Sequence, residues 1–109
     1  MKYINNIRQV KQVLNKAMGD SLNELGIMAT TNTQAITPVD TGKLRRSITY
    51  KTDSQNLKVY IGTNIQYAIN VHEGTSKQKA NPFISNGIKE TQPSIRNILK
   101  KNFNKNMGR

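Results

Sequence analysis

The 109-residue sequence contains no cysteine, no tryptophan and a single histidine, His72. Without cysteine, the chain can form neither a disulfide framework nor a thiolate metal site. One histidine and scattered carboxylates do not supply the three or more ordered ligands that a metal centre needs. These absences exclude disulfide-stapled domains and zinc–thiolate modules, and we expect no cofactor.

Long apolar runs and aromatic residues are also scarce. No apolar stretch approaches the roughly 20 residues of a membrane-spanning helix, and the N-terminal segment is too polar for a signal peptide. Aromatic residues make up 6% of the chain, which leaves few rings on which nucleic-acid bases could stack. We therefore expect a protein assembled in the cytosol that does not engage a membrane.

Acidic residues are few: 6 Asp and Glu stand against 17 Lys and Arg, for a formal net charge of +11. The excess lies toward the C-terminus, where residues 77–109 carry eight positive side chains and one negative, a net +7. Such a bias favours polyanionic partners, including nucleic acid and acidic protein surfaces. A solvated helix face is the alternative interpretation of the same charges.

The size and hydrophobicity of the chain predict one domain, residues 1–109, with little surplus burial. Hydrophobic residues account for 35% of the sequence, below the 45–50% typical of globular domains, a figure that includes glycine. We therefore expect a subunit that gains part of its stability against neighbouring molecules.

Residues 3–36 are predicted to form a long amphipathic helix. Gly19 and Gly26 each cost about 1 kcal/mol relative to alanine, so a kink or break is expected there. Pro38 ends the helix because it pushes Thr37 toward extended geometry. Apolar residues recur at three- and four-residue spacing, which indicates one core-facing stripe: Ile4, Ile7, Val10, Leu14, Ala17, Met18, Leu22, Leu25, Met28 and Ala29.

A turn and a β-hairpin are predicted over residues 37–62. Residues 44–52 alternate imperfectly between apolar and polar, as in a half-buried strand, and residues 57–62 alternate more regularly. The intervening "DSQN" has turn chemistry. With about six residues a side, this hairpin needs a helix on its apolar face.

The segment "TPVDTGK" that precedes the hairpin could be a small active site or a structural turn. In a turn, Pro38 presets φ, Asp40 accepts backbone N–H bonds, and Gly42 supplies a conformation disfavoured for other residues. Thr41 lies within the same turn. We favour the turn, and expect it to direct Leu44 into the sheet.

A short helix and a basic loop are predicted over residues 63–82, with Gly74 ending the helix. A second long helix is predicted over residues 83–106. Pro93 should kink that helix or restart it as a first-turn proline, capped by Thr91 or Gln92. The order of elements predicts an α+β fold, in which N-terminal and C-terminal helices pack on a small antiparallel sheet.

Catalysis finds little support in the sequence. Among the enzymatic hypotheses, the best supported is a one-metal nuclease that uses Asp40, His72 and Glu73. The spacing of these residues is nevertheless almost no evidence for a catalytic site. The alternative is that His72 caps or packs at the end of the short helix. We interpret the chain as a non-enzyme.

Three segments, taken in order, resemble a single protein family: "PVDTGKLRRSI" (38–48), "VYIGTNIQYAINVHEGT" (59–75) and "KANPFI" (79–84). They are similar to the tail-component, or head–tail joining, proteins of long-tailed bacteriophages. The resemblance covers roughly residues 30–90. It departs from the family pattern at His72 and Glu73, where an acid followed by an aromatic residue is usual.

The resemblance implies a structural virion protein at the head–tail junction or the tail end, with no active site. It suggests a homo-oligomeric ring, with sixfold symmetry, that contacts the head connector and tail-tube proteins. Passing double-stranded DNA would meet only non-specific contacts. The alternative function is a small, basic, non-specific nucleic-acid-binding protein.

We expect the loops at residues 37–46 and 73–82 to form the contact surfaces, because loops carry function on a rigid scaffold. The candidate subunit or partner contacts are Arg45, Arg46, Tyr67, His72, Glu73, Gly74, Thr75, Lys77, Lys79, Pro82 and Phe83.

Overall fold

The computed structural model describes residues 2–38, 42–65, 68–74 and 79–106. Its elements in chain order are α1 (Lys2–Ile36), α2 (Lys43–Ser47), β1 (Thr49–Asp53), β2 (Lys58–Gly62), α3 (Ala68–Glu73), α4 (Phe83–Thr91), the 3₁₀ turn η1 (Gln92–Ser94) and α5 (Ile95–Asn106). The α+β class predicted from the sequence is confirmed, with long N-terminal and C-terminal helices and a two-stranded antiparallel sheet.

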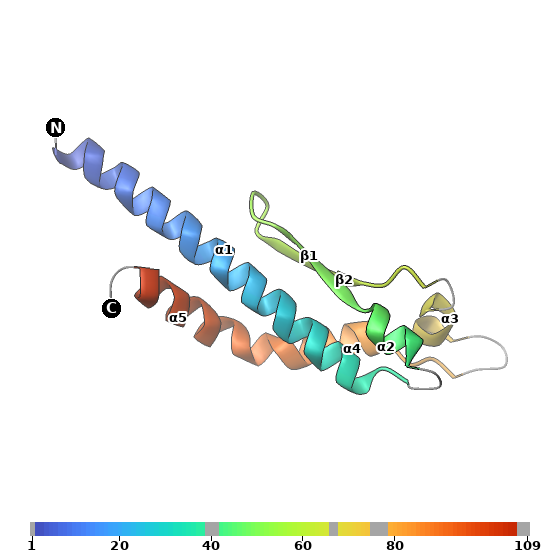
Figure 1. The fold of residues 1–109 in the computed structure, drawn as a ribbon. Helices are drawn as coiled ribbons and strands as arrows, with labels where there is room; N and C mark the ends of the chain where they lie inside the picture. The colour runs from blue at the N-terminus through green and yellow to red at the C-terminus, as the bar shows by residue number, and fades with distance from the viewer. Residues whose placement is uncertain (1, 39–41, 66–67, 75–78, 107–109) are drawn as a thin grey trace.

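The molecule is a rod built along α1 (Figure 1). Helices α4 and α5 run back along α1, the hairpin also packs on it, and α2 and α3 gather at the far end. The molecule measures 68 × 22 × 20 Å, and its radius of gyration is 18.0 Å. A compact chain of this length would have a radius of gyration of about 13 Å. The elongation leaves a large surface relative to the core.

Helix α1 is continuous from Lys2 to Ile36, so the expected kink or break at its glycines is not found. A Cβ atom at Gly19 would meet no other atom within 4 Å, whereas one at Gly26 would collide with the ring of Tyr50. Gly26 therefore serves close packing against the hairpin. The helix ends as predicted, just before Pro38.

The contact between α1 and the returning helices is close and rich in small polar residues. Ser21 and Thr33 of α1 have no exposed surface, and Asn102 of α5 is 2% exposed. The Ser21 hydroxyl donates to the Ala17 carbonyl at 2.8 Å, and the Asn102 amide donates to its own helix. Local bonds of this kind allow polar side chains to be buried between helices.

Three polar contacts join α1 to α4 and α5 along their antiparallel course. Each pairs a residue of α1 with one of the returning helices, and together they fix the register of the helices. They are Asn32 Nδ2 to Thr91 Oγ1 at 2.9 Å, Lys101 Nζ to Glu24 Oε1 at 2.6 Å, and Asn106 Nδ2 to Asp20 Oδ2 at 3.2 Å.

The hairpin pairs β1 with β2 in antiparallel register, from Thr49 opposite Gly62 to Asp53 opposite Lys58. The carboxylate of Asp53 accepts hydrogen bonds from the backbone and the side-chain amide of Asn56, at 3.3 and 2.8 Å. This contact closes the predicted "DSQN" turn. In the described part of the chain, the sheet has these two strands only.

The predicted strand over 44–52 is wrong in its first half. Residues Lys43–Ser47 form the short helix α2, and β1 begins at Thr49. Leu44 and Ile48 are each 4% exposed, and their spacing of four residues suits one face of a helical turn as well as it suits a strand. Leu44 therefore enters the core from a helix and not from the sheet.

The turn before α2 agrees with the prediction at Gly42, whose φ of 78° lies in the left-handed region that favours glycine. Asp40 and Thr41 lie outside the described residues, so the expected bonds of Asp40 remain a prediction. Pro93 interrupts the predicted 83–106 helix, as expected, within the turn η1. The expected capping bond is not formed, because the Thr91 hydroxyl donates to the Gly87 carbonyl at 3.0 Å.

Candidate functional site

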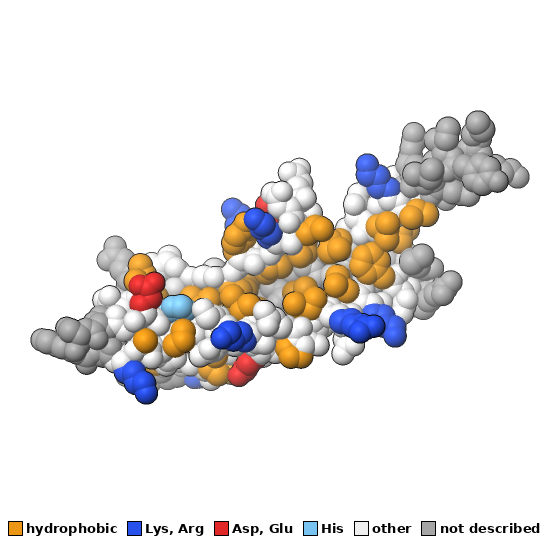
Figure 2. Space-filling view, turned by 180° about the vertical axis from the view of Figure 1, so that it is seen from behind, with side chains coloured by type: hydrophobic (Ala, Val, Ile, Leu, Met, Phe, Trp, Pro, Cys, Tyr) orange, Lys and Arg blue, Asp and Glu red, His pale blue; other side chains and the backbone are white. Residues whose placement is uncertain are grey.

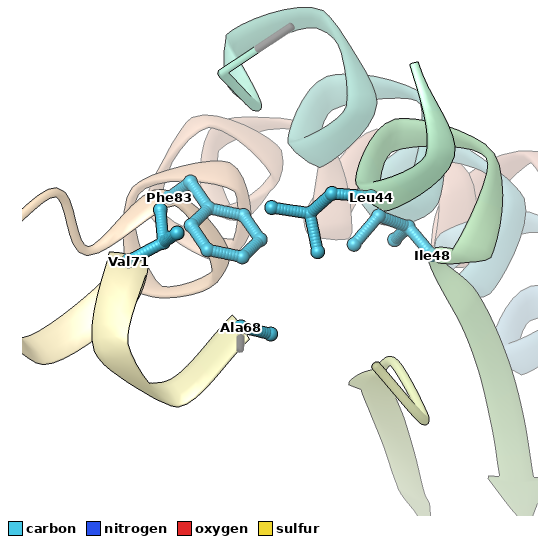
Figure 3. Packing of buried hydrophobic residues seen from close by; sticks show 5 residues of the cluster. All are labelled: Leu44, Ile48, Ala68, Val71 and Phe83. Carbon is cyan, nitrogen blue, oxygen red and sulfur yellow. The ribbon is translucent and has the colours of Figure 1, made fainter. Parts of the chain in front are cut away.

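The structure gathers most of the predicted contact segments at one end of the rod. We call this region the loop end and define it as residues 42–48, 63–65, 68–74 and 79–85. Its core contains side chains from α2, α3 and the first turn of α4 (Figure 3). The buried cluster comprises Leu44, Ile48, Ala68, Val71 and Phe83.

Backbone hydrogen bonds hold the segments of the loop end together. Gly74 ends α3 with a φ of 81°, and its N–H donates to the Asn70 carbonyl at 2.8 Å. The Asn81 N–H donates to the Val71 carbonyl at 2.9 Å, so the segment leading into α4 is attached to α3. The helix end predicted at Gly74 is confirmed.

His72 packs at the end of α3, as the non-catalytic interpretation expects. Its ring meets Phe83 edge to face, with ring centroids 5.8 Å apart and an interplanar angle of 70°. Its Nε2 lies 3.2 Å from Ser85 Oγ. Asp40 of the hypothetical nuclease lies outside the described residues, and within those described no cluster of three His, Asp or Glu could hold a metal.

The two arginines of α2 differ in their surroundings. Arg45 is half-buried, and its Nη2 donates to the Thr37 carbonyl at 3.4 Å, which ties α2 to the end of α1. Arg46 is exposed, and its guanidinium lies over Gly42. Arg46 is therefore the arginine that α2 presents to solvent, while Arg45 is largely engaged within the fold.

A shallow hollow of about 550 Å³ opens at the loop end between α3, the start of α4 and the segment after β2. Ile69 on its edge is 66% exposed. The hollow is lined chiefly by Ile65, Ile69, His72, Glu73, Ile84 and Ser85. This uncovered apolar surface beside Glu73 is suited to contact with another protein.

The remaining candidate contacts are distributed unevenly. Glu73, Lys79 and Pro82 are exposed at the loop end, and Gly74 is half-buried. Phe83 has no exposed surface and supports the site from within. Tyr67, Thr75 and Lys77 lie outside the described residues. Sequence reasoning missed Ile69 and Ser85, because an apolar or small side chain on a short helix gives no signal of exposure.

The family comparison extends over the long helix, the hairpin and α3. Residues 2–74 match the model of the HK97-gp10-like family, which is described as "Bacteriophage HK97-gp10, putative tail-component". The match spans well over half of the chain. The chain belongs to this family of phage tail components.

Membership in this family makes the chain a structural component of the phage particle and points away from catalysis. It confirms the resemblance found in the sequence. The matched range ends at Gly74, and so leaves out the "KANPFI" segment and helices α4 and α5. Comparison with curated proteins and with solved structures found no match. None of the described helices is long and apolar enough to cross a membrane.

Proposed function

We propose that this tail component acts at the head–tail interface. It joins the head connector to the tail tube, or completes the tail, by assembling into a homo-oligomeric ring. The single observation that carries this proposal is a two-stranded sheet, packed on α1, whose outer strand edges are open. Each strand has one edge that no other described strand pairs.

Open strand edges favour assembly because their unpaired backbone groups can add a neighbour's strand. If β1 of one subunit pairs with β2 of the next, the contact is head-to-tail, and repeating it closes a ring when the rotation allows. In long-tailed phages, the head connector and the tail tube are themselves cyclic assemblies. We expect six subunits, as the family resemblance suggests.

The loop end supplies the surface that meets the head connector or the tail tube. Arg46, Glu73 and Lys79 are exposed at this end of the rod, and Glu73 lines the apolar hollow. A mixed charged rim around apolar surface is typical of protein–protein contacts. The protein would assemble in the host cytoplasm and remain in the virion.

Electron microscopy of lysates from a phage with a stop codon in this gene tests the proposal. Filled heads beside finished, separate tails are expected for a joining protein. Missing or overlong tails would place it in tail completion instead. Normal infectious particles would overturn the structural function altogether.

The ring and the loop end can be tested separately. Native mass spectrometry of the full chain should show a closed oligomer, and a monomer at all concentrations and in virion extracts would contradict the ring. Lys77→Glu combined with Lys79→Glu should reduce particle yield while leaving the circular dichroism spectrum unchanged. Lys11→Glu, which changes an exposed lysine of α1 far from the loop end, is the control and should leave yield intact.

A free-standing nucleic-acid-binding protein is the competing function, favoured by the exposed Arg96, Lys100 and Lys105 of α5. It predicts retention of DNA with an affinity that falls steeply as salt rises. It also predicts binding without any phage partner. Under our proposal, DNA passing the junction meets weak, sequence-independent contacts only, so retention at physiological salt should be slight.

A further inference from the structure

A second uncovered apolar surface runs along the middle of the rod, away from the loop end. The hairpin and the α4–α5 pair form its two walls, and α1 forms its floor. Figure 2 shows it as a band of hydrophobic side chains between the hairpin and the helices. We call it the central groove. It encloses about 350 Å³ and is lined chiefly by Leu25, Leu57, Val59, Ile88, Ile95 and Leu99.

The residues of the groove walls are only partly covered by their own chain. Leu57 is 57% exposed, Ile88 40% and Ile95 38%. Leaving such side chains in water forgoes the favourable free energy of burying them. A contiguous apolar surface of this kind marks an interaction site in soluble proteins.

The chemistry of the groove suits aliphatic side chains better than a small polar ligand. Small-molecule sites combine apolar walls with a few convergent polar groups. The polar lining here is Thr91 and Gln92. The hydroxyl of Thr91 already donates to the Gly87 carbonyl and accepts from Asn32. An apolar protein segment is the better occupant.

The dimensions and spacing of the groove fit a helix. Ile88, Ile95 and Leu99 lie on one side of the α4–α5 pair, and the eleven residue steps from Ile88 to Leu99 extend about 16 Å. That length is about three turns of a partner helix. Amphipathic helices bind such grooves through apolar anchors spaced three or four residues apart.

Positive charge flanks the groove along the helical wall. Lys89, Arg96 and Lys100 are exposed, and their spacing places them on the solvent side of the groove-lining residues. Figure 2 shows Lys and Arg side chains on either side of the hydrophobic band, with fewer Asp and Glu side chains among them. Charge complementarity therefore selects a partner with acidic residues beside its apolar anchors.

A second copy of this chain is a poor occupant. Its uncovered helical segment is the N-terminal part of α1, where Val10 is 51% and Leu14 42% exposed. Residues 2–16 carry four Lys and Arg and no Asp or Glu. Placing that basic segment beside a basic rim opposes like charges, which disfavours the pairing.

We propose that the central groove binds an acidic amphipathic helix of a neighbouring virion protein. The identity of the partner as a virion protein rests on the function proposed above, whereas binding of an acidic helix does not. The loop end and the groove would thus bind different molecules. The groove proposal can fail while the ring and the joining function stand.

Binding is tested with the full chain and a fluorescent helical peptide that carries leucines at three- and four-residue spacing with flanking glutamates. A matched peptide has lysine in place of every glutamate. We expect at least about tenfold tighter binding of the acidic peptide, weakening as salt rises. Equal binding of both peptides, or none, would overturn the proposal.

Two variants locate the binding site. Ile95→Asp in the groove should weaken binding of the acidic peptide at least about tenfold, whereas Ile27→Asp, at a 55% exposed position outside the groove, should not. Arg96→Glu with Lys100→Glu should reverse the preference between the two peptides, and Lys11→Glu should leave it unchanged. Circular dichroism and thermal unfolding check that each variant folds. Loss of binding in the control variants alone would contradict the groove assignment.

A photo-crosslinking residue at position 95, incorporated during infection, identifies the occupant in virions. We expect crosslinks to an acidic, amphipathic segment of a different phage protein, mapped by mass spectrometry. Crosslinks to another copy of this chain, or to DNA, would overturn the proposal. Particles with heads joined to tails but without crosslinks at position 95 would overturn the groove proposal alone. Normal particles from the stop-codon phage would overturn the proposed function.

Discussion

The aromatic ring of Tyr50 in β1 rests directly against the backbone of Gly26 in α1. A Cβ atom at position 26 would lie under 3.0 Å from three atoms of that ring. No other residue type leaves this space, so the glycine allows the hairpin to approach the long helix. A two-stranded hairpin is marginal by itself, and this contact is one of the features that hold it in place.

Gly26→Ala should therefore destabilise the protein despite the higher helix propensity of alanine. Overpacking costs about 1–3 kcal/mol, against a propensity gain of about 1 kcal/mol. Gly19→Ala is the matched control, since a Cβ there meets nothing within 4 Å, and it should raise the free energy of unfolding by about 1 kcal/mol. Urea unfolding measures both. Equal stabilisation by the two substitutions would contradict the packing role of Gly26.

Thr91→Val should lower stability by about 1–3 kcal/mol, because it leaves the part-buried amide of Asn32 without its acceptor. Thr31→Val is the control. Thr31 is exposed, and its hydroxyl donates only to the Ile27 carbonyl of its own helix. Removing this hydroxyl should change the free energy of unfolding by about 0.5 kcal/mol or less. Comparable losses at both positions would argue against the contact between the helices.

Thr33→Val should have the opposite effect from Thr91→Val. Thr33 has no exposed surface, and its buried hydroxyl has no hydrogen-bond partner among the described residues. Burying a hydroxyl without a partner costs about 1–3 kcal/mol on the scale of protein mutations. Valine has nearly the same shape, so we expect a higher thermal midpoint. A lower midpoint would show that the hydroxyl is satisfied in solution.

Stability should fall at acid pH in part through Asp20. Hydrogen bonds from the Asn106 amide and from Lys16 hold the pKa of Asp20 below its ordinary value. A carboxyl with a lowered pKa in the folded state stabilises the fold above its unfolded pKa, and this contribution is lost as pH falls through the folded pKa. Asp20→Asn should therefore flatten the acid side of the pH–stability curve.

The pH experiment has an internal comparison at Asp53, whose pKa is lowered chiefly by hydrogen bonds from Asn56. That pair lies within one hairpin turn, whereas Asp20 and Asn106 join helices far apart in sequence. We expect the protection of α5 amides from hydrogen exchange, relative to their intrinsic rates at each pH, to fall at low pH and to respond to Asp20→Asn and not to Asp53→Asn. The reverse pattern would contradict the assignment of the acid effect to α5.

The sequence predicts well those features that local chemistry determines. The end of α1 before Pro38, the "DSQN" turn and the break at Pro93 all follow from nearby residues. The core-facing stripe of α1 is correct at Ala17, Leu22 and Ala29 and wrong at Val10 and Leu14, which are 51% and 42% exposed. Gly42 and Gly74 both have positive φ, as their positions suggested. Each of these depends on a few neighbouring residues, so no knowledge of the tertiary structure was needed.

Features that depend on contacts between distant segments could not be predicted. Leu44 and Ile48 fit a strand or a helical turn equally, and the buried cluster with Phe83 selects the helix. Nothing near Gly26 in the sequence predicts its contact with the ring of Tyr50. Asparagine side chains normally face solvent. Asn102 is nevertheless buried by its neighbours in the fold.

The described residues among the predicted contacts lie together at one end of the molecule, but the sequence does not predict how their surroundings differ. Exposed Arg46 and half-buried Arg45 are adjacent and look alike in sequence, and only their placement on α2 separates them. The central groove carried no motif at all. Its apolar residues come from α1, the hairpin and the α4–α5 pair, which are far apart in sequence and meet only in the folded chain.

The three polar contacts between α1 and the returning helices have a mechanical consequence. Their α1 members, Asp20, Glu24 and Asn32, are spread over about 18 Å of helix. Sliding α4 and α5 along α1 by one turn, about 5.4 Å, would break all three contacts together, so these contacts oppose sliding along the helix axis. A load along the axis of the rod would therefore move α1, α4 and α5 together as one stiff unit.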